Sequence, residues 1–376
     1  MTRPLDDIFV LDFSTLLPGP LATLMLAEAG AEVVKLERPG TGEDMRRFEP
    51  QLDAKSLGYT LLNRGKKSIA LDLKEAGSVE VLRPLIEKAD VIVEQFRPGV
   101  MERLGLGYEA VRKMNPDIIY CSITGYGQSG PKSLVAGHDM NYLGDAGLLS
   151  ISTGPVDNPT VPPALMADVG GGSYPAVVNI LLALRNRDRT GQGAHLDIAM
   201  AEGVFAFAYW AYAQGVVLDQ PVPNGAARLT GAVPRYRMYP TSDGKLAAVA
   251  CIEQKFWDAF CGVIDMPADL RDDSRDPAAC ISEIGRRVLM HDAAHWEKLF
   301  KAADCCCTIV KDLSQAATDP HFQDRGIFDW KVGMGDRDIQ ALVLPIAAEF
   351  RGAKEDRVPA PALGEDNADY GVGDPS

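Results

Sequence analysis

Several motifs that mark common enzyme chemistries are missing from this sequence. Its seven cysteines form neither a CxxC pair nor a Cys/His metal spacing, and Cys305, Cys306 and Cys307 are consecutive. With no histidine or basic activator nearby in sequence, we expect reduced, structural thiols and no metal site. There is no P-loop and no GxSxG elbow, and the turn FSTLLPGPLAT after the first apolar run lacks GxGxxG. These absences disfavour NAD or FAD use.

Positive charge is also scarce. The chain has 38 Lys and Arg residues against 52 Asp and Glu, a formal net charge of −14. This sign argues against nucleic acid or an anionic membrane as a main partner. An anionic small molecule would need basic residues gathered in one place. The start, MTRPLDDIFVLDF, has no signal-peptide architecture, so we expect a cytoplasmic protein.

Length and composition fit an ordinary globular protein. With 376 residues, 46% hydrophobic and 24% charged, the chain can form two domains or one elaborated domain. The most apolar stretch, AMAEGVFAFAYWAYAQGVV, carries Glu202 and Gln214. We therefore expect a buried or interface helix there rather than a membrane span.

The first 150 residues alternate short apolar runs with helical patterns. The runs IFVLDF, EVVKLE, SIALDL, DVIVEQF and DIIYCSITGYG are typical of buried parallel strands. The patterns PLATLMLAEAG, SVEVLRPLIEKA and MERLGLGYEAVRKMN, which lie between several of these runs, are helical. This alternation predicts an α/β fold with a doubly wound parallel sheet.

Pro/Gly-rich stretches suggest the domain boundaries. We expect a large domain over 1–200, a helical linker over 201–224 and a small domain over 225–330 that opens with the strand-like KLAAVAC. A C-terminal segment, 331–376, follows. Its polar tail KEDRVPAPALGEDNADYGVGDPS is expected to lie over the surface or to be partly disordered.

Basic residues gather at the predicted C-terminal strand ends and the turns after them. Open α/β sheets bind ligands at these positions, and arginine presents a fork that matches phosphate oxygens. The cluster therefore predicts a polyanion site, although solvated surface charges are the alternative for any one member. The residues are Arg38, Arg64, Lys66, Lys67, Lys74, Arg97 and Arg103.

One histidine and one aspartate stand out in the following region. His138 lies in a loop after a strand, in GYGQSGPKSLVAGHDMNY, and Asp168 directly precedes VGGG and a helical run. A packed or surface histidine and a helix N-cap are the ordinary interpretations. The functional interpretation is a pair of bases, with N–H groups at the helix N-terminus holding a developing oxyanion.

Two further features are weaker. Glu253, in ACIEQKFW at a strand end, is equally suited to a salt bridge and to a site. His291 and His295 are four residues apart on a predicted helix, a spacing compatible with a metal. The zincin glutamate is absent and the flanks are amphipathic, so we interpret both as surface histidines.

The sequence resembles the family III CoA-transferases (the CaiB/BaiF group), and within them the α-methylacyl-CoA racemases. The resemblance covers nearly the whole chain. Its motifs are VLDFSTLLPGPLATLMLAEAGAEVVKLERPG, RPGVMERLGLGY, GYGQSGP, GHDMNY, DVGGGSYPAVVNILLALRNRDRTGQG, DCCCTIVKDLSQAATDPHFQDR and PAPALG, in this order.

The resemblance implies catalytic roles for three residues. Transferases of the family use one aspartate as nucleophile, which Asp168 matches. Racemases add the histidine of GHD, matched by His138, and a glutamate in an IEPxF-like strand end, matched by Glu253. Gln254 stands where proline is common, which weakens the match of Glu253. The histidine favours a racemase of 2-methylacyl-CoA thioesters over a CoA-transferase, and over a CoA-binding or scaffold protein with a vestigial site.

The resemblance also implies the ligand site and the assembly. CoA, the only cofactor-like group expected, would contact one set of residues, and no metal is implied. The fold would be a Rossmann-like large domain plus a smaller α+β domain in an interlocked-ring homodimer, with the C-terminal segment returning to the large domain. Glu253 would then reach His138 across the dimer. The CoA set is Arg38, Leu71, Asp72, Leu73, Lys74, Gln95, Phe96, Arg97, Arg103, Gly137, Asp139, Met140, Asn141 and Tyr142.

The implied proton transfer is energetically demanding. A thioester α-proton lies roughly a dozen pKa units above a carboxylate or imidazole, which amounts to ~16 kcal/mol at 1.36 kcal/mol per unit. Stabilisation of an enolate must supplement the two bases. A tension follows, because a helix N-terminus lowers a carboxyl pKa, whereas Asp168 must be protonated during part of the cycle.

Overall fold

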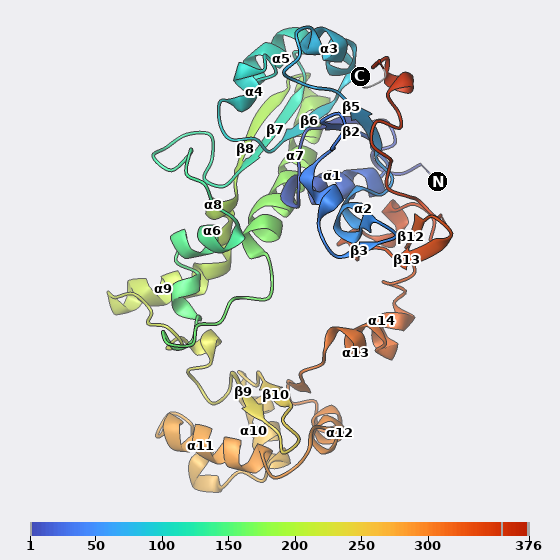
Figure 1. Cartoon of the computed structure of the whole chain (residues 1–376). Helices are drawn as coiled ribbons and strands as arrows, with labels where there is room; N and C mark the ends of the chain where they lie inside the picture. Colours follow the sequence, from blue (N-terminus) through green and yellow to red (C-terminus); the bar gives the residue numbers. More distant parts are fainter. Residues whose placement is uncertain (1, 355, 374–376) are drawn as a thin grey trace. The chain divides into compact units, whose positions relative to one another are not determined.

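The structure, a computed structural model, describes residues 2–354 and 356–373 (Figure 1). It divides into two compact units. Unit 1 comprises the described residues of Met1–Ala146, Ala164–Phe207 and Gln323–Ser376, and unit 2 comprises Gly147–Pro163 and Ala208–Phe322.

Unit 1 is built on a six-stranded, wholly parallel sheet, which confirms the predicted α/β class. Its strand order is β5-β2-β1-β6-β7-β8, so the direction of winding reverses between β1 and β6. Open sheets of this kind bind ligands at the carboxyl ends of the strands beside such a switch point. The strands are β1 (Phe9–Asp12), β2 (Glu32–Glu37), β5 (Lys67–Ala70), β6 (Val91–Glu94), β7 (Ile119–Thr124) and β8 (Ala194–Ala199).

Helices cover both faces of this sheet, as its buried apolar strands require. Helices α1 (Pro18–Glu28) and α7 (Tyr174–Thr190) pack together and against strands, and α3 (Ser78–Lys88) packs on α5 (Tyr108–Met114). Pro18 opens α1, where proline is favoured because its missing N–H would be unpaired anyway. Shorter helices in unit 1 are α2 (Leu57–Asn63), α4 (Val100–Arg103), α6 (Asp139–Asp145) and α8 (Met200–Val204), and β3 (Gln51–Leu52) pairs with β4 (Lys55–Ser56).

The C-terminal segment belongs to unit 1. A hairpin of β12 (Lys331–Met334) and β13 (Arg337–Gln340) comes first. The tail then satisfies the free edge of β5: the Ser68 N–H donates to Asp366 (2.8 Å) and the Ala70 N–H to Asn367 (2.8 Å). Covering an edge strand in this way blocks pairing with other chains. The tail over 356–373 is therefore an ordered part of the sheet's edge.

Unit 2 contains an antiparallel sheet in the order β11-β10-β9, which packs with helices around a core that includes Trp257 and Trp296. Five of its six cysteines are buried, and Cys306 is exposed. The strands are β9 (Arg237–Pro240), β10 (Leu246–Val249) and β11 (Cys307–Ile309), and the helices are α9 (Tyr209–Leu218), α10 (Gln254–Val263), α11 (Pro277–Val288), α12 (Ala293–Ala303), α13 (Leu313–Ala317) and most of α14 (Pro320–Asp324).

Two observed boundaries differ from the expected ones. Residues 147–163, placed by sequence in the large domain, belong to unit 2 because Ile151 packs with Ala211, Val222 and Ala227. Residues 201–224 are no separate linker, since unit 1 keeps them as far as Phe207 and unit 2 takes the remainder. Both boundaries depend on contacts between distant segments, which the local amino-acid composition does not indicate.

The apolar stretch 199–217 is not one buried helix. It forms α8, a short 3-10 turn and α9, and α9 leaves Tyr209, Tyr212 and Val217 more than 70% exposed. By length and composition alone, a different segment, Met166–Thr190, is long and apolar enough to cross a membrane. Part of that segment is buried against α1 and the sheet, which also explains its apolar character.

Candidate active site

A cavity of about 920 Å³ lies at the carboxyl edge of the sheet in unit 1. Segments that follow β1, β2, β5 and β6 line it, as expected beside the switch point. The cavity brings together seven residues of the predicted CoA set: Arg38, Leu71, Asp72, Leu73, Lys74, Phe96 and Arg103. Sequence analysis missed other lining residues, among them Phe13, Thr15, Thr41, Asp44 and Val372.

Three cations can face a ligand in this cavity. Arg38 is oriented by Asp44 (2.9 Å) and by the Gly42 carbonyl oxygen (3.3 Å), both on the loop after β2. The exposed side chains of Lys74 and Arg103 have no ion-pair partner within the described ranges. The cavity is lined by acidic residues as well, and Lys74 and Arg103 are its cations without an ion-pair partner among the described residues.

The other members of the basic cluster point elsewhere, which corrects the prediction. Arg64 is buried against Glu28 (2.7 Å), and Lys66 is buried against Asp12 (3.0 Å). Lys67 pairs with Asp366 on the C-terminal tail. Their partners come from distant parts of the chain, so adjacent charges in the sequence take up different environments.

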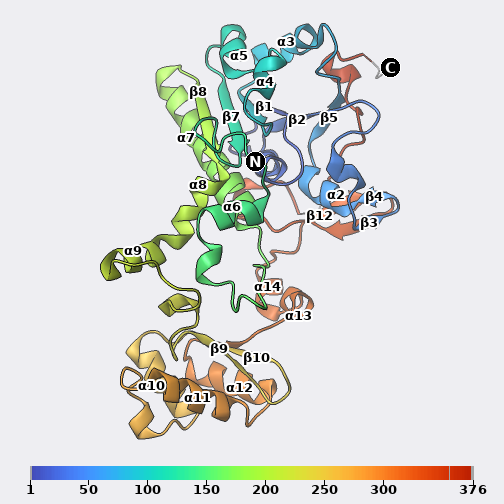
Figure 2. The same ribbon diagram turned by 60° about the vertical axis from the view of Figure 1, so that its left-hand side comes forward.

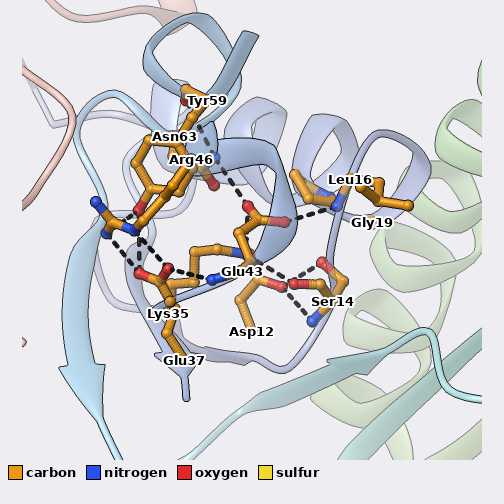
Figure 3. A network of polar contacts seen from close by, with 12 residues as sticks. Asp12, Ser14, Leu16, Gly19, Lys35, Glu37, Glu43, Arg46, Tyr59 and Asn63 are labelled. Carbon is orange, nitrogen blue, oxygen red and sulfur yellow. Dashed lines mark hydrogen bonds and ion pairs between the residues drawn. The ribbon is translucent and has the colours of Figure 1, made fainter. Parts of the chain in front are cut away.

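A buried network of charges lies beside the cavity (Figure 3). Lys35 donates to the Ser14 carbonyl oxygen (2.7 Å) and lies 3.3 Å from Glu43. Burial works to raise the pKa of Asp12, but the ammonium groups of Lys66 and Lys35 outweigh it and hold that pKa below its usual value. The sequence analysis missed this network. The signal that could have indicated it is a charged residue inside an apolar strand, as Asp12 in VLDF and Lys35 in EVVKLE.

In the turn after β6, Gln95 and Arg97 have different environments. The Gln95 Oε1 accepts the Gly19 N–H (2.9 Å) in the first turn of α1, and Gln95 is not among the lining residues of the cavity. Arg97 is exposed, and its charge works against the burial that raises the pKa of Tyr142. Arg97 therefore lies on the side of this edge that faces α6.

His138 and Asp168 lie on neighbouring helical elements of unit 1. His138 is exposed and immediately precedes α6, where its N–H donates to the Asn141 side chain (3.0 Å). Asp168 lies in the first turn of a π-helix, Met166–Ser173, that leads directly into α7. The helix that His138 precedes, α6, packs against the π-helix that carries Asp168. The joint catalytic role of the two residues stays a prediction.

Asp139 occupies the N–H groups expected to stabilise an oxyanion. Its buried carboxylate accepts the N–H groups of Ala167 (2.7 Å) and Asp168 (3.0 Å). The Val169 N–H donates to the Leu165 carbonyl oxygen (3.0 Å). These N–H groups are therefore engaged in the structure, which differs from the expectation, and Asp168 is no N-cap.

The position of Asp139 also bears on the protonation of Asp168, whose pKa a helix N-terminus was expected to lower. Burial raises the pKa of Asp168 to about 6, the Asp139 carboxylate adds to this increase, and His138 opposes it. The negative charge of Asp139 lies where the helix dipole would have lowered the pKa. The neighbouring carboxylate and burial together raise the pKa of Asp168 although the residue lies in the first turn of a helix.

Close packing explains the three glycines after Asp168. A Cβ on Gly171 would overlap the Met200 carbonyl oxygen, and one on Gly203 would overlap the Gly171 Cα. A Cβ on Gly170 would overlap the ring of Phe207. The glycines therefore let α8 lie against the π-helix, and α6 contacts both elements (Figure 2).

The rest of the GHDMNY loop supports this site from within. Buried Tyr142 donates from its hydroxyl group to the Gly137 carbonyl oxygen, and the Asn141 side chain caps the backbone of His138. Met140 is exposed. None of these residues is among those that line the cavity, so their predicted contact with CoA stays a prediction.

Glu253 belongs to unit 2, apart from the unit that holds His138 and Asp168. It is exposed and immediately precedes α10. The next residue, Gln254, accepts a hydrogen bond from Arg235 (3.0 Å). The role of Glu253 stays a prediction.

The open α/β unit thus has a cavity at its switch point that presents Arg38, Lys74 and Arg103, and it also carries His138 and Asp168 on helical elements that pack together. The model of CoA-transferase family III matches residues 5–367, and the chain belongs to this family. It is an enzyme of the family III CoA-transferase and racemase superfamily, as the sequence resemblance indicated.

Individual relatives include both activities. The chain is 34% identical to human alpha-methylacyl-CoA racemase over 348 residues, 91% of this chain and 86% of that protein. It is 32% identical to acetyl-CoA:oxalate CoA-transferase of Acetobacter aceti over 336 residues, 86% of this chain and 85% of that protein. The crystal structure of a CAIB/BAIF family protein from Brucella suis matches with a TM-score of 0.83 at 26% identity, over 98% of both chains.

Proposed function

We propose that the protein inverts the α-carbon of 2-methyl-branched acyl-CoA thioesters by 1,1-proton transfer through an enolate. The observation that carries the proposal is the pairing of exposed His138 with Asp168, whose pKa is raised to about 6. A carboxyl group with this pKa supplies a proton near neutral pH, which an aspartate with its usual value does not.

In the forward direction the neutral imidazole of His138 removes the α-proton, and the electron pair moves onto the thioester oxygen. The carboxylic acid of Asp168 then delivers its proton to the opposite face of the α-carbon. This leaves an imidazolium and a carboxylate. The pair is reset by the reverse reaction or by proton exchange with water.

The CoA moiety is assigned to the cavity, and no other cofactor is proposed. Arg38, Lys74 and Arg103 supply cations for its phosphates, and arginine matches phosphate oxygens with two parallel hydrogen bonds. A volume of about 920 Å³ is at the upper end of small-molecule sites.

A homodimer is part of the proposal. In unit 1, α7 exposes Val178, Leu181 and Leu182, and in unit 2, α9 exposes Tyr212 and Val217. Apolar surface of this kind supports burial against a second copy. Glu253 of that copy is the group we assign beside His138.

A CoA-transferase is the second candidate, with Asp168 attacking an acyl-CoA as nucleophile. It is supported by relatives such as succinyl-CoA:glutarate CoA-transferase from mouse, which is 37% identical over 275 residues, 73% of this chain. This reaction needs a free carboxylic acid as acceptor, which inversion does not.

The test is incubation of one enantiomer of a 2-methylacyl-CoA in D₂O without added acid. Inversion predicts α-deuterium together with loss of optical purity. A transferase predicts neither, but shows CoA transfer once a carboxylic acid is added, with an acyl-enzyme that hydroxylamine traps.

A further inference from the structure

The turn from Leu16 to Gly19 touches both parts of the candidate site. Its neighbours Phe13 and Thr15 line the cavity. At its other end, the Pro18 carbonyl oxygen accepts the hydroxyl of Ser173 (2.8 Å), which lies in the same π-helix as Asp168. The position of this turn is therefore shared by the cavity and the helix that carries the acid.

The backbone of this turn is held from outside. Leu16 has a φ of +63°, a left-handed conformation that is unfavourable for a residue with a Cβ. Its N–H donates to the Glu43 Oε2 (2.7 Å), and the N–H of Gly19 donates to the Gln95 Oε1 (2.9 Å). Two side chains from the loops after β2 and β6 thus fix the turn. Figure 3 shows the first of these contacts, from Leu16 to Glu43.

Glu43 is suited to this task because each of its neighbours is a donor. Its Oε2 accepts from Leu16, while its Oε1 lies 3.3 Å from the Lys35 ammonium and 3.5 Å from the Asn63 amide nitrogen. A carboxylate accepts from all three, but a glutamine has one oxygen and must turn its NH₂ group toward a donor. Glu43 and Lys35 are both almost fully buried, so a lost hydrogen bond between these groups is costly.

We propose that Glu43 is a positioning residue that, with Gln95, fixes the Leu16–Gly19 turn and thereby couples the CoA cavity to the helix of Asp168. The inference rests on the proposed function, because it assigns CoA to that cavity. Glu43 itself lines the cavity, and the role assigned to it here is to hold the turn rather than to bind a phosphate.

The experiment measures CoA binding by calorimetry and the rate of α-proton exchange in D₂O for Glu43→Gln. We expect the Kd for CoA to rise about tenfold, equivalent to about 1.4 kcal/mol, and kcat to fall as well. Glu28→Gln is the matched control: Glu28 is also a largely buried carboxylate with two basic partners, Arg64 (2.7 Å) and Arg351 (2.9 Å), but it lies at the far end of α1. It should lower the Tm without changing Kd or kcat.

A rescue variant separates positioning from general destabilisation. Glycine adopts the left-handed conformation without strain, so Leu16→Gly combined with Glu43→Gln should recover part of the lost affinity. If Glu43→Gln does not fold, Gln95→Leu tests the other anchor and should raise the Kd in the same direction.

The outcomes are distinct. The inference would be overturned if Glu43→Gln had the same Kd and kcat as the wild type. It would also be overturned if Glu28→Gln caused the same losses and Leu16→Gly did not reduce the losses of Glu43→Gln. In both cases the proposed function would stand. Failure of the wild-type protein to bind CoA would contradict the proposed function and remove the basis of the inference with it.

Discussion

Two groups of buried or half-buried carboxylates in unit 1 have opposite electrostatic surroundings. In the network, Lys66 and Lys35 surround Asp12 and hold its pKa below the usual value. In the candidate active site, Asp168 has a second carboxylate, Asp139, as its neighbour and a pKa raised to about 6. The same residue type is a permanent anion in one place and an exchangeable acid in the other. Burial acts on both, so the charge of the neighbours decides the outcome.

The largest expected effect comes from removing the base of the pair. His138→Ala should reduce the inversion rate by roughly 10²–10⁴-fold, the usual contribution of a general base. Chiral chromatography of the product thioester measures it. His321→Ala, at an exposed histidine of unit 2, is the control and should leave the rate unchanged. A fully active His138→Ala variant would contradict the two-base scheme.

Substitutions in the buried charge network around Asp12 should change the free energy of unfolding rather than the rate of the reaction. Lys66→Met leaves the Asp12 carboxylate buried with a lost partner, which costs about 3–5 kcal/mol in the free energy of unfolding. Lys67→Met, one residue later but half exposed, should cost less than about 1 kcal/mol. Urea denaturation of both variants gives the comparison, and equal losses would show that Lys66 is not held as described.

The glycines of the π-helix should tolerate no side chain. Gly171→Ala directs a methyl group at the Met200 carbonyl oxygen and should destabilise the protein by about 1–3 kcal/mol. In α10, Gly262→Ala meets no atom within 4 Å and should instead stabilise it by about 0.5–1 kcal/mol. Thermal unfolding distinguishes the two, and an unchanged Tm for Gly171→Ala would refute the close packing of α8.

The smallest predicted effect is a shift in titration. Asp139→Asn keeps an acceptor for the N–H groups but removes the charge, so the pKa of Asp168 should move down from about 6 toward its ordinary value of 3.8. In the wild type, Asp168 favours the folded state while protonated, and this stabilisation is lost as pH rises from about 4 to about 6. The Asp139→Asn variant should lose less stability over the same pH range. The ¹³C shift of the Asp168 carboxyl group reports the midpoint directly, and an unchanged value would exclude Asp139 as a cause.

Sequence patterns predicted the architecture of unit 1 because it depends on local signals. Five apolar runs between turns became β1, β2, β5, β6 and β7, and positions after β1, β2, β5 and β6 line one cavity. His138 and Asp168 were found through their motifs, and the structure places them on helical elements that pack together.

Long-range partners account for what sequence could not supply. Lys66 and Lys67 are adjacent and identical, but Lys66 is buried with Asp12 as its ion-pair partner, whereas Lys67 is half exposed and pairs with Asp366. Asp168 looked like an N-cap because its context is glycine and helix, but Asp139 takes the N–H groups that a cap would accept. Glu43 gave no signal as a positioning residue, since its partner Leu16 precedes it by 27 residues.

The most direct test of the two-base mechanism is stereospecific proton exchange in the single-base variants. Each enantiomer of a 2-methylacyl-CoA is incubated in D₂O with His138→Ala and with Asp168→Asn. We expect reciprocal behaviour: inversion falls by roughly 10²–10⁴-fold in both variants, His138→Ala exchanges the α-proton of one enantiomer only, and Asp168→Asn exchanges that of the other only. Inversion at the wild-type rate by either variant, or exchange of both enantiomers by the same variant, would contradict the two-base mechanism.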